Sequence, residues 1–264
     1  MNALENVQVH LTEFSKKFND FSREYNQSVH HFPQLERVID DYSKFITDRG
    51  NKEAWERLER EELGDLNPLV LDLRRKSALC VAIMEKYRAI KLQDGKAEIT
   101  DYFKNIEACI EKEFGSFQVA SDSKVILVGS GAFPMTPLLI AKRTGAEVVG
   151  IDIDEEALQL GRKVVEKLGN DLNIRLEKTL IENLAFAQEA THIIFSSTVE
   201  IKYELLDQLH ALTNQDVVVA MRYGNGFKSL FNYPMQEVDE NKWKMVDDIL
   251  RPDDVFDIAL YKKV

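Results

Sequence analysis

The chain has 264 residues, a formal net charge of −11 at pH 7 and 44% hydrophobic residues. This length suffices for one large domain or two modest ones, each with a buried core. The excess of acidic residues argues against nucleic acid and anionic membranes as partners, because both attract basic surfaces. We expect a soluble, cytoplasmic protein, since the sequence shows neither a signal-peptide pattern nor an apolar run near the roughly 20 residues that span a bilayer.

Up to about residue 114, apolar residues recur at spacings of three and four, as in amphipathic helices. The first such stripe consists of Leu4, Val7, Leu11, Phe14, Phe18, Phe21 and Tyr25. Turn-forming residues predict breaks at His31–Pro33, Asp48–Gly50, Leu66–Pro68 and Asp94–Gly95. This half is therefore predicted to be a bundle of about five helices.

From about residue 119 the pattern changes to short strands that alternate with helices. The predicted strands are Val125–Val128, Val148–Ile151, Ile174–Glu177, His192–Phe195, Val217–Met221 and Phe256–Tyr261. Helices are predicted at Glu155–Leu168, with Asp154 as its N-cap, and at Tyr203–Thr213. We predict an α/β protein with a helical bundle domain over residues 1–118 and a Rossmann-like, doubly wound, mostly parallel sheet over residues 119–264.

Gly129 and Gly131 follow the first predicted strand and Asp152 ends the second, which is the order of a nucleotide-binding βαβ unit. The glycines allow a tight turn and a close approach of the backbone to a ligand, and Asp152 can accept hydrogen bonds from a ribose. Phe133 and Pro134, the latter expected at the first helical position, replace the third glycine of a dinucleotide fingerprint. We therefore predict S-adenosylmethionine, which has no diphosphate, rather than NAD. A tight turn without a ligand is the alternative.

Ligands of open α/β sheets bind beyond the carboxyl ends of the strands. Loop residues at those ends extend the predicted site. We assign Ser130, Phe133, Pro134, Ile153 and Ser196, with Gly129, Gly131 and Asp152, to the cofactor and Thr198 to the substrate.

The sequence predicts no metal site, because its five histidines are scattered without metal-ligand spacing. Cys80 and Cys109 lack CxxC spacing and lie in apolar helical patterns, so we expect small buried hydrophobes in a reducing compartment.

Glu85 is the candidate catalytic carboxylate of the helical half. It follows Ala78 and Ala82 and precedes Ala89 at spacings of four, three and four, which places all four residues on one helix face. A glutamate among alanines has room beside it for a substrate or for a partner helix. A structural glutamate paired with a nearby basic residue is the alternative.

Several segments resemble the nicotianamine synthase family. They are Gly129–Thr136, Gly150–Asp154, and Val218–Gly226 with Phe231–Pro234. Within that family, three further segments are most similar to the staphylococcal members that act on D-histidine in staphylopine-type metallophore synthesis. They are Tyr102–Glu107, Thr191–Thr198 and Phe256–Lys263. The resemblance implies a class I methyltransferase-type sheet preceded by helices.

The resemblance also implies an activity. It is the transfer of the 2-aminobutanoyl group of S-adenosylmethionine to the α-amine of histidine, in the D-form, with release of 5′-methylthioadenosine. An opine dehydrogenase is then expected to take the product onward. A homodimer through the phenylalanine-rich N-terminal stripe stays open, although core packing is the favoured interpretation of that stripe.

The resemblance assigns roles residue by residue. Glu85 matches the glutamate that receives the amine proton, and Tyr102 matches the first residue of a tyrosine pair near the reacting amine. The second residue of that pair is Phe103 here, which leaves open which ring faces the substrate. Asn105 matches a polar substrate contact. Two alternatives remain: a small-molecule methyltransferase, and a module that binds S-adenosylmethionine without turnover.

Overall fold

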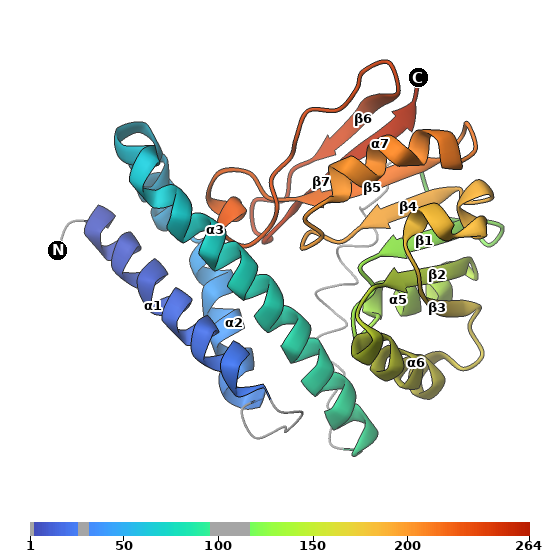
Figure 1. Ribbon diagram of the computed structural model, residues 1–264, viewed down its shortest axis with the longest axis horizontal. Helices are drawn as coiled ribbons and strands as arrows, with labels where there is room; N and C mark the ends of the chain where they lie inside the picture. Colours follow the sequence, from blue (N-terminus) through green and yellow to red (C-terminus); the bar gives the residue numbers. More distant parts are fainter. Residues whose placement is uncertain (1–2, 26–31, 96–116) are drawn as a thin grey trace. The chain divides into compact units, whose positions relative to one another are not determined.

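The computed structural model describes residues 3–25, 32–95 and 117–264 (Figure 1), which form two compact units. The first, here the helical unit, comprises Met1–Tyr87, Tyr223–Met235 and Arg251–Asp257. The second, here the sheet unit, comprises Arg88–Arg222, Gln236–Leu250 and Ile258–Val264. Each unit therefore combines stretches that are far apart in the sequence.

The described helices of the first half are α1 (Ala3–Glu24), α2 (Phe32–Thr47) and α3 (Arg49–Gln93). Their ends lie beside three of the predicted breaks, at residues 31–33, 48–50 and 94–95. The predicted apolar stripe of α1 is buried in the core of the helical unit, together with α2 and α3. That core includes Val7, Leu11, Phe14, Phe18, Leu35, Ile39 and Tyr42.

The break predicted at Leu66–Pro68 is wrong, because α3 continues through Pro68. A proline inside a helix removes one backbone hydrogen bond and costs about 3 kcal/mol. Leu58, Val70 and Leu73 lie on both sides of Pro68 and are buried in the same core. Burial of each such side chain contributes about 1.5–3 kcal/mol, so a continuous helix is favoured.

Cys80 is a small buried hydrophobe, as predicted. Its Sγ lies 3.3 Å from the carbonyl oxygen of Phe18, to which it donates. Burial raises the pKa of the Cys80 thiol to about 12, so little reactive thiolate forms near neutral pH. Cys109 lies outside the described residues.

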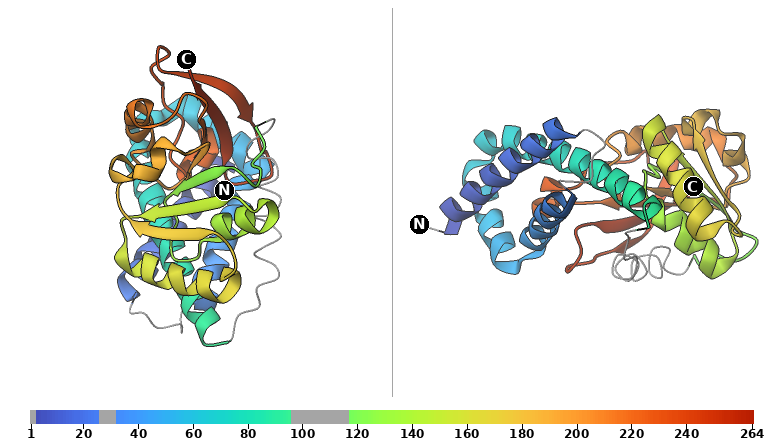
Figure 2. Two further views of the ribbon diagram at one scale, coloured as in Figure 1. Left: turned by 90° about the vertical axis from the view of Figure 1, so that its right-hand side faces the viewer. Right: turned by 90° about the horizontal axis from the view of Figure 1, so that it is seen from below.

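Seven strands form one sheet in the order β3-β2-β1-β4-β5-β7-β6 (Figures 1 and 2). The strands are β1 (Lys124–Val128), β2 (Glu147–Asp152), β3 (Ile174–Lys178), β4 (His192–Phe195), β5 (Val218–Tyr223), β6 (Trp243–Ile249) and β7 (Asp257–Lys263). β1 to β5 are parallel to their neighbours in this group, and β6 and β7 are antiparallel to each other. The strand order reverses between β1 and β4, which is where ligands of such sheets bind. The doubly wound, mostly parallel sheet is thus confirmed.

β6, which lies at the edge of the sheet, was not predicted from the sequence. Only Trp243 is buried in this strand, and residues 244–248 are all exposed. A bulge between Met245 and Asp247 interrupts the pairing with β7. Exposed charges and a bulge are common on edge strands, because they hinder pairing with another chain. They also remove the alternating apolar pattern on which strand prediction depends.

Three α-helices connect the strands: α5 (Met135–Thr144), α6 (Glu155–Gly169) and α7 (Lys202–Leu212). α5 and α6 pack against each other and against β2 and β3. Short 3₁₀ helices follow β3 and β5, namely η1 (Ile181–Asn183), η2 (Ala185–Gln188) and η3 (Gly226–Leu230). The connections place the loops after β1, β2, β4 and β5 at the carboxyl edge of the sheet.

Asp154 is the N-cap of α6, as predicted. Its backbone is extended (φ −82°, ψ 106°), and its carboxylate accepts a hydrogen bond from the N–H group of Ala157 at 3.2 Å. Replacing Asp154 with alanine should lower the free energy of unfolding by about 1 kcal/mol, measured by urea denaturation, because the cap and a favourable charge are lost. Asp154→Ser keeps an acceptor and should recover most of this loss. Unchanged stability of Asp154→Ala would contradict the capping role.

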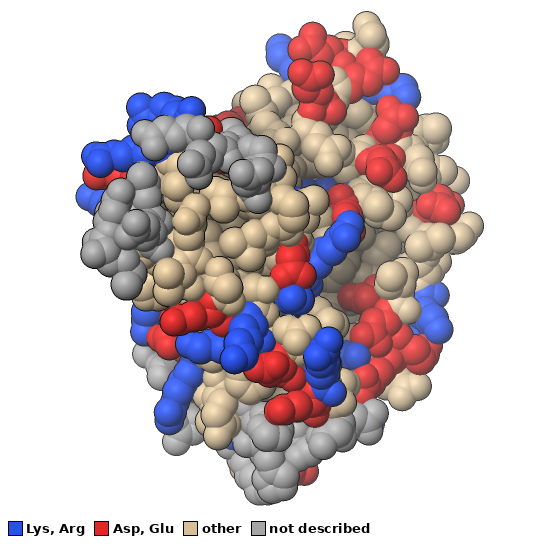
Figure 3. Space-filling view, turned by 60° about the vertical axis from the view of Figure 1, so that its left-hand side comes forward, with Lys and Arg blue, Asp and Glu red and all other residues tan. Residues whose placement is uncertain are grey.

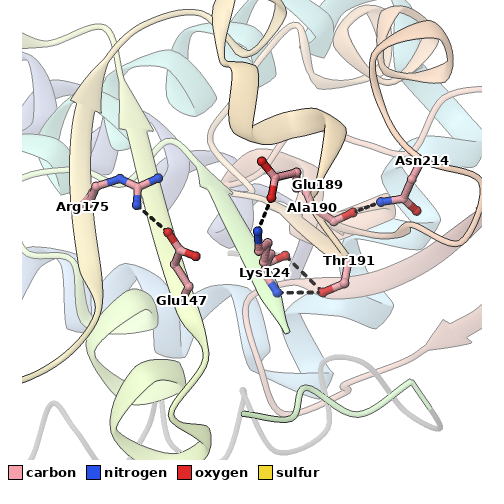
Figure 4. Close-up of polar contacts among 7 residues, drawn as sticks. All are labelled: Lys124, Glu147, Arg175, Glu189, Ala190, Thr191 and Asn214. Atoms are coloured by element: carbon pink, nitrogen blue, oxygen red, sulfur yellow. Dashed lines mark hydrogen bonds and ion pairs between the residues drawn. The ribbon is translucent and has the colours of Figure 1, made fainter. Parts of the chain in front are cut away.

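Polar contacts tie the strands together at the opposite, amino edge (Figure 4). Lys124 pairs with Glu189, and its backbone N–H group donates to Thr191 Oγ1 at 3.0 Å. Arg175 of β3 pairs with Glu147 of β2. These side chains lie at the starts of the strands, so we interpret them as structural.

His192 at the start of β4 is 7% exposed. Its Nε2 lies 3.2 Å from the carbonyl oxygen of Phe117, and its Nδ1 lies 2.8 Å from Thr191 Oγ1. Burial lowers the pKa of the imidazole below its usual value, against the opposing effect of the Phe117 carbonyl. The unfolded chain therefore binds this proton more readily than the folded protein does.

The lowered pKa predicts that the free energy of unfolding falls as the pH drops below about 6.5, the pKa of histidine in the unfolded chain. Above this pH the contribution of His192 to the free energy of unfolding is constant. Urea denaturation of the wild type and of His192→Gln between pH 7.5 and pH 5.5 tests the effect. The variant should have the smaller slope. Equal slopes would show that His192 does not carry the dependence.

Candidate active site

The loop after β1 folds back over the end of β2. Gly129 and Gly131 have φ angles of +82° and +65°, and the N–H group of Gly129 donates to the carbonyl oxygen of Ile151 at 2.9 Å. A Cβ atom at Gly129 would lie 2.9 Å from Val199 Cγ2 and 3.1 Å from Ser196 Cβ. Glycine is therefore required both by the backbone angle and by the close approach of the loop after β4.

Two glycines outside the loop make room for it. A Cβ atom at Gly150 would lie 2.8 Å from Ser130 Cβ, and one at Gly161 would lie 3.2 Å from the carbonyl oxygen of Gly131. Ser130 is buried, and its hydroxyl has no hydrogen-bond partner among the described residues. A buried hydroxyl without a partner is unfavourable, so a bound ligand or water is the expected partner.

Asp152 braces the glycine loop. One carboxylate oxygen accepts from the N–H group of Gly131 at 2.9 Å, and the other accepts from Ile153 and Asp154 at 2.8 and 3.0 Å. A carboxylate has about four acceptor positions, so capacity remains for a ribose hydroxyl. Ile153 is 73% exposed beside it. A carboxylate next to an exposed aliphatic side chain suits a nucleoside, which has polar hydroxyls and an apolar base.

Pro134 is the N-cap of α5 and not its first helical residue, so that prediction is wrong by one position. The N–H group of Met135 turns back to the carbonyl oxygen of Phe133 at 2.8 Å, which delays the start of the helix. Pro137 removes a further N–H group from the first turn. A diphosphate is usually bound by such N–H groups, so this helix start fits a ligand without one.

The side chain of Phe133 is 6% exposed and lies in the core of the sheet unit. It belongs to a cluster with Ala89, Leu92, Met135 and Leu138. The ring therefore anchors the loop in this core, and a contact of Phe133 with the cofactor remains a prediction.

Ser196 and Thr198 lie together at the end of β4, with their hydroxyl oxygens 3.4 Å apart. Both side chains are partly exposed. The structure thus places these two predicted residues beside Gly129 and the loop after β1.

The sequence analysis assigned no role to Lys202 and Arg222. Lys202 is fully buried, and its ammonium donates to the carbonyl oxygens of Ser197 at 3.2 Å and Arg222 at 2.7 Å. The guanidinium of Arg222 donates to Thr136 Oγ1 at 3.2 Å. The one sequence signal that could have indicated Arg222 is its position as a charged residue directly after the apolar strand segment 217–221.

Glu85 lies on α3 and is partly exposed, like Ala78 and Ala82, while Ala89 is buried. Because α3 is continuous over this range, the four residues share one helix face, as predicted. The catalytic role of Glu85 remains a prediction.

In the helical unit, the segment after β5 is held by α2 and α3. The hydroxyl of Tyr42 donates to the carbonyl oxygen of Leu230 at 2.8 Å, and Arg74 Nε donates to that of Ser229 at 2.6 Å. The guanidinium of Arg74 lies 5.3 Å from the ring centroid of Tyr233. These contacts fix the conformation of one segment that carries the family resemblance.

Tyr102 and Asn105 lie outside the described residues, so their roles remain predictions. Over the described ranges, no group of three or more His, Cys, Asp and Glu side chains could hold a metal ion. None of the described helices is long and apolar enough to cross a membrane. On the face in Figure 3, acidic and basic side chains are interspersed.

Comparison with known proteins agrees with this geometry. Residues 120–258 match a family model described as a methyltransferase domain. An L-histidine 2-aminobutanoyltransferase of Yersinia pestis is 30% identical over 241 residues, which are 90% of this chain and 89% of that protein. One of Pseudomonas aeruginosa is 29% identical over 211 residues, 80% of each chain.

Among solved structures, a mutant of the nicotianamine synthase MtNAS has a TM-score of 0.79 at 14% identity, covering 96% of this chain and 97% of that one. MtNAS in complex with MTA and tNA has a TM-score of 0.75 at 14% identity, covering 97% and 98%. At this identity the likeness concerns the fold alone, and it confirms the nicotianamine synthase-like architecture. The chain therefore belongs to the methyltransferase-domain family and to the same family as the 2-aminobutanoyltransferase of Yersinia pestis.

Proposed function

We propose that the protein transfers the 2-aminobutanoyl group of S-adenosylmethionine to the α-amine of histidine and releases 5′-methylthioadenosine. The observation that carries this proposal is the 30% identity, over 90% of the chain, to an enzyme named for that transfer. The glycine loop independently supports S-adenosylmethionine as the donor, because its helix start lacks the N–H groups that a diphosphate cofactor uses.

The residues present fit S-adenosylmethionine. Asp152 would accept from the ribose hydroxyls, and Ile153 would cover a face of the adenine. The backbone between Gly129 and Gly131 would lie against the ligand, and Ser196 would complete the wall from the loop after β4. Ser130 offers the buried hydroxyl that has no described partner.

S-adenosylmethionine supplies a side-chain carbon activated by the adjacent sulfonium. The acceptor amine forms a bond to that carbon as the carbon–sulfur bond breaks, and one proton must leave the amine. We assign this proton to the carboxylate of Glu85, and assign Tyr102 and Asn105 to holding the acceptor. With a good leaving group already present, the main contributions of the chain are alignment and proton removal.

Product analysis by mass spectrometry, after incubation with S-adenosylmethionine and histidine, tests the reaction. Methylthioadenosine and an aminobutanoyl-histidine in equal amounts are expected. S-adenosylhomocysteine with methylated histidine would instead establish a small-molecule methyltransferase. Binding of S-adenosylmethionine without turnover of any amino acid would establish a sensing module.

The configuration of the acceptor is a finer part of the proposal. The segments similar to the staphylococcal enzymes favour D-histidine, whereas the curated relatives are named for L-histidine. We propose the D-form. Initial rates with each enantiomer decide this point: a higher kcat/KM for L-histidine would contradict the D assignment and leave the transfer reaction intact.

The organisation around the reaction is also proposed. The helical part, residues 1–118, would cover the acceptor, and residues 119–264 would hold the donor. An opine dehydrogenase would consume the product in the cytoplasm. Light scattering of the purified protein would show whether it forms a homodimer.

A further inference from the structure

Arg222, near the end of β5, is an arginine that the proposed reaction has not yet used. It is 9% exposed and lies in the sheet unit. Its backbone carbonyl oxygen is bound by the fully buried ammonium of Lys202, which also binds Ser197. The ammonium of Lys202 therefore fixes the position of the Arg222 backbone.

The guanidinium of Arg222 is directed toward the glycine loop. It donates to Thr136 Oγ1 at 3.2 Å, and Thr136 is itself buried at the start of α5. In the sheet, β4 lies between β5 and β1. The contact thus joins the end of β5 to the first turn of α5, the helix that follows β1, beside the point between β1 and β4 where the strand order reverses. Ligands of such sheets bind at this point.

The chemistry of arginine indicates what it recognises. A guanidinium stays protonated throughout the physiological pH range, and its fork of N–H groups matches the two oxygens of a carboxylate. The donor and the acceptor of the proposed reaction each carry one α-carboxylate. Thr136 lies in the first turn of α5, directly after the loop assigned to the donor, so its contact with Arg222 favours the donor.

We propose that Arg222 binds the α-carboxylate of the aminobutanoyl arm of S-adenosylmethionine. This assignment rests on the proposed function. In it, Thr136 and Lys202 are positioning residues, because they orient the guanidinium and the strand end that carries it. Holding the carboxylate would fix the arm that is transferred, so that its carbon next to sulfur stays in line with the incoming amine.

Three ligands separate this role from a general effect on the site. They are S-adenosylmethionine, decarboxylated S-adenosylmethionine and methylthioadenosine, of which only the first carries the carboxylate. Calorimetric titration without histidine measures their affinities. Arg222→Gln should weaken the binding of S-adenosylmethionine by about tenfold to a hundredfold, as expected for a lost charge-assisted pair. The affinities for the other two ligands should change by less than about twofold.

Two further variants serve as controls. Arg175→Gln removes an arginine at the amino edge (Figure 4) and should leave all three affinities unchanged. Thr136→Val keeps the guanidinium but removes its hydroxyl partner. It should weaken the binding of S-adenosylmethionine alone, and by less than Arg222→Gln does. It tests the same contact if Arg222→Gln fails to fold, as judged by circular dichroism.

Two results would overturn the assignment. An equal loss for all three ligands would make Arg222 structural. Unchanged affinity for S-adenosylmethionine would exclude the donor carboxylate, and a raised KM for histidine alongside it would move the contact to the acceptor. A wild-type protein that binds no S-adenosylmethionine would instead defeat the proposed function itself.

Discussion

Replacing Glu85 with glutamine is expected to lower kcat by at least about a hundredfold while S-adenosylmethionine affinity stays within about twofold. General-base groups typically contribute 10²–10⁴-fold to rate, and glutamine keeps the size of the side chain but cannot accept the proton. Single-turnover rates, with calorimetric binding of the donor, measure the two effects separately.

The matched control for this variant is Glu56→Gln. Glu56 lies on the same helix but is exposed, and it pairs only loosely with Lys52 at 4.0 Å. The Glu56→Gln variant should therefore have the kcat of the wild type. If Glu85→Gln retained full activity with normal donor binding, Glu85 would be a structural glutamate of the alanine stripe. If it lost donor binding together with activity, the residue would act through the site's structure and not through proton transfer.

Gly129→Ala is expected to weaken donor binding strongly and to destabilise the sheet unit. Alanine at a φ of +82° costs about 1 kcal/mol in backbone strain alone. Its Cβ would in addition lie 2.9 Å from Val199 and 3.1 Å from Ser196, so the loops after β1 and β4 must move apart. We expect the free energy of unfolding to fall by about 2–4 kcal/mol in total, and S-adenosylmethionine affinity to fall by more than tenfold.

Gly145→Ala separates strain from crowding. Gly145 has a similar φ of +77°, but a Cβ there would meet only Ser121, at 3.7 Å. The free energy of unfolding of this variant should fall by about 1 kcal/mol, and donor binding should be retained. Equal effects of the two variants, in urea denaturation and calorimetry, would mean that the close approach of Ser196 to Gly129 is unimportant.

The central strands were predictable because their chemistry is local. β1, β2, β4 and β5 are buried, continuous apolar runs that end in glycine or polar residues, which is typical of a parallel sheet covered on both faces. The N-cap at Asp154 was predictable for the same reason, since a cap depends only on its own turn. β6 escaped prediction because its exposed residues have no apolar periodicity.

Features that depend on distant contacts were not predictable. Pro68 indicated a break in isolation, but burial on both sides keeps α3 continuous. The burial of the Phe133 ring was not predictable either, because it depends on Ala89 and Leu92, which lie much earlier in the chain.

The site shows the same division between local and distant information. Gly129, Gly131 and Asp152 were recognised from their spacing, and the structure brings them together. Lys202 and Arg222 were not recognised, because their importance comes from hydrogen bonds that join α7, β5 and α5, which are far apart in the sequence. The bracing of Asp152 by three backbone N–H groups was equally invisible in the sequence.

The central claim is that the aminobutanoyl arm, and not the methyl group, leaves the sulfonium. Turnover of S-adenosylmethionine labelled with ¹³C in its methyl group, with histidine as acceptor, tests it directly by mass spectrometry. The account predicts that all the label stays with the nucleoside, as methylthioadenosine, and that the histidine product is unlabelled. Label in the histidine product would contradict it.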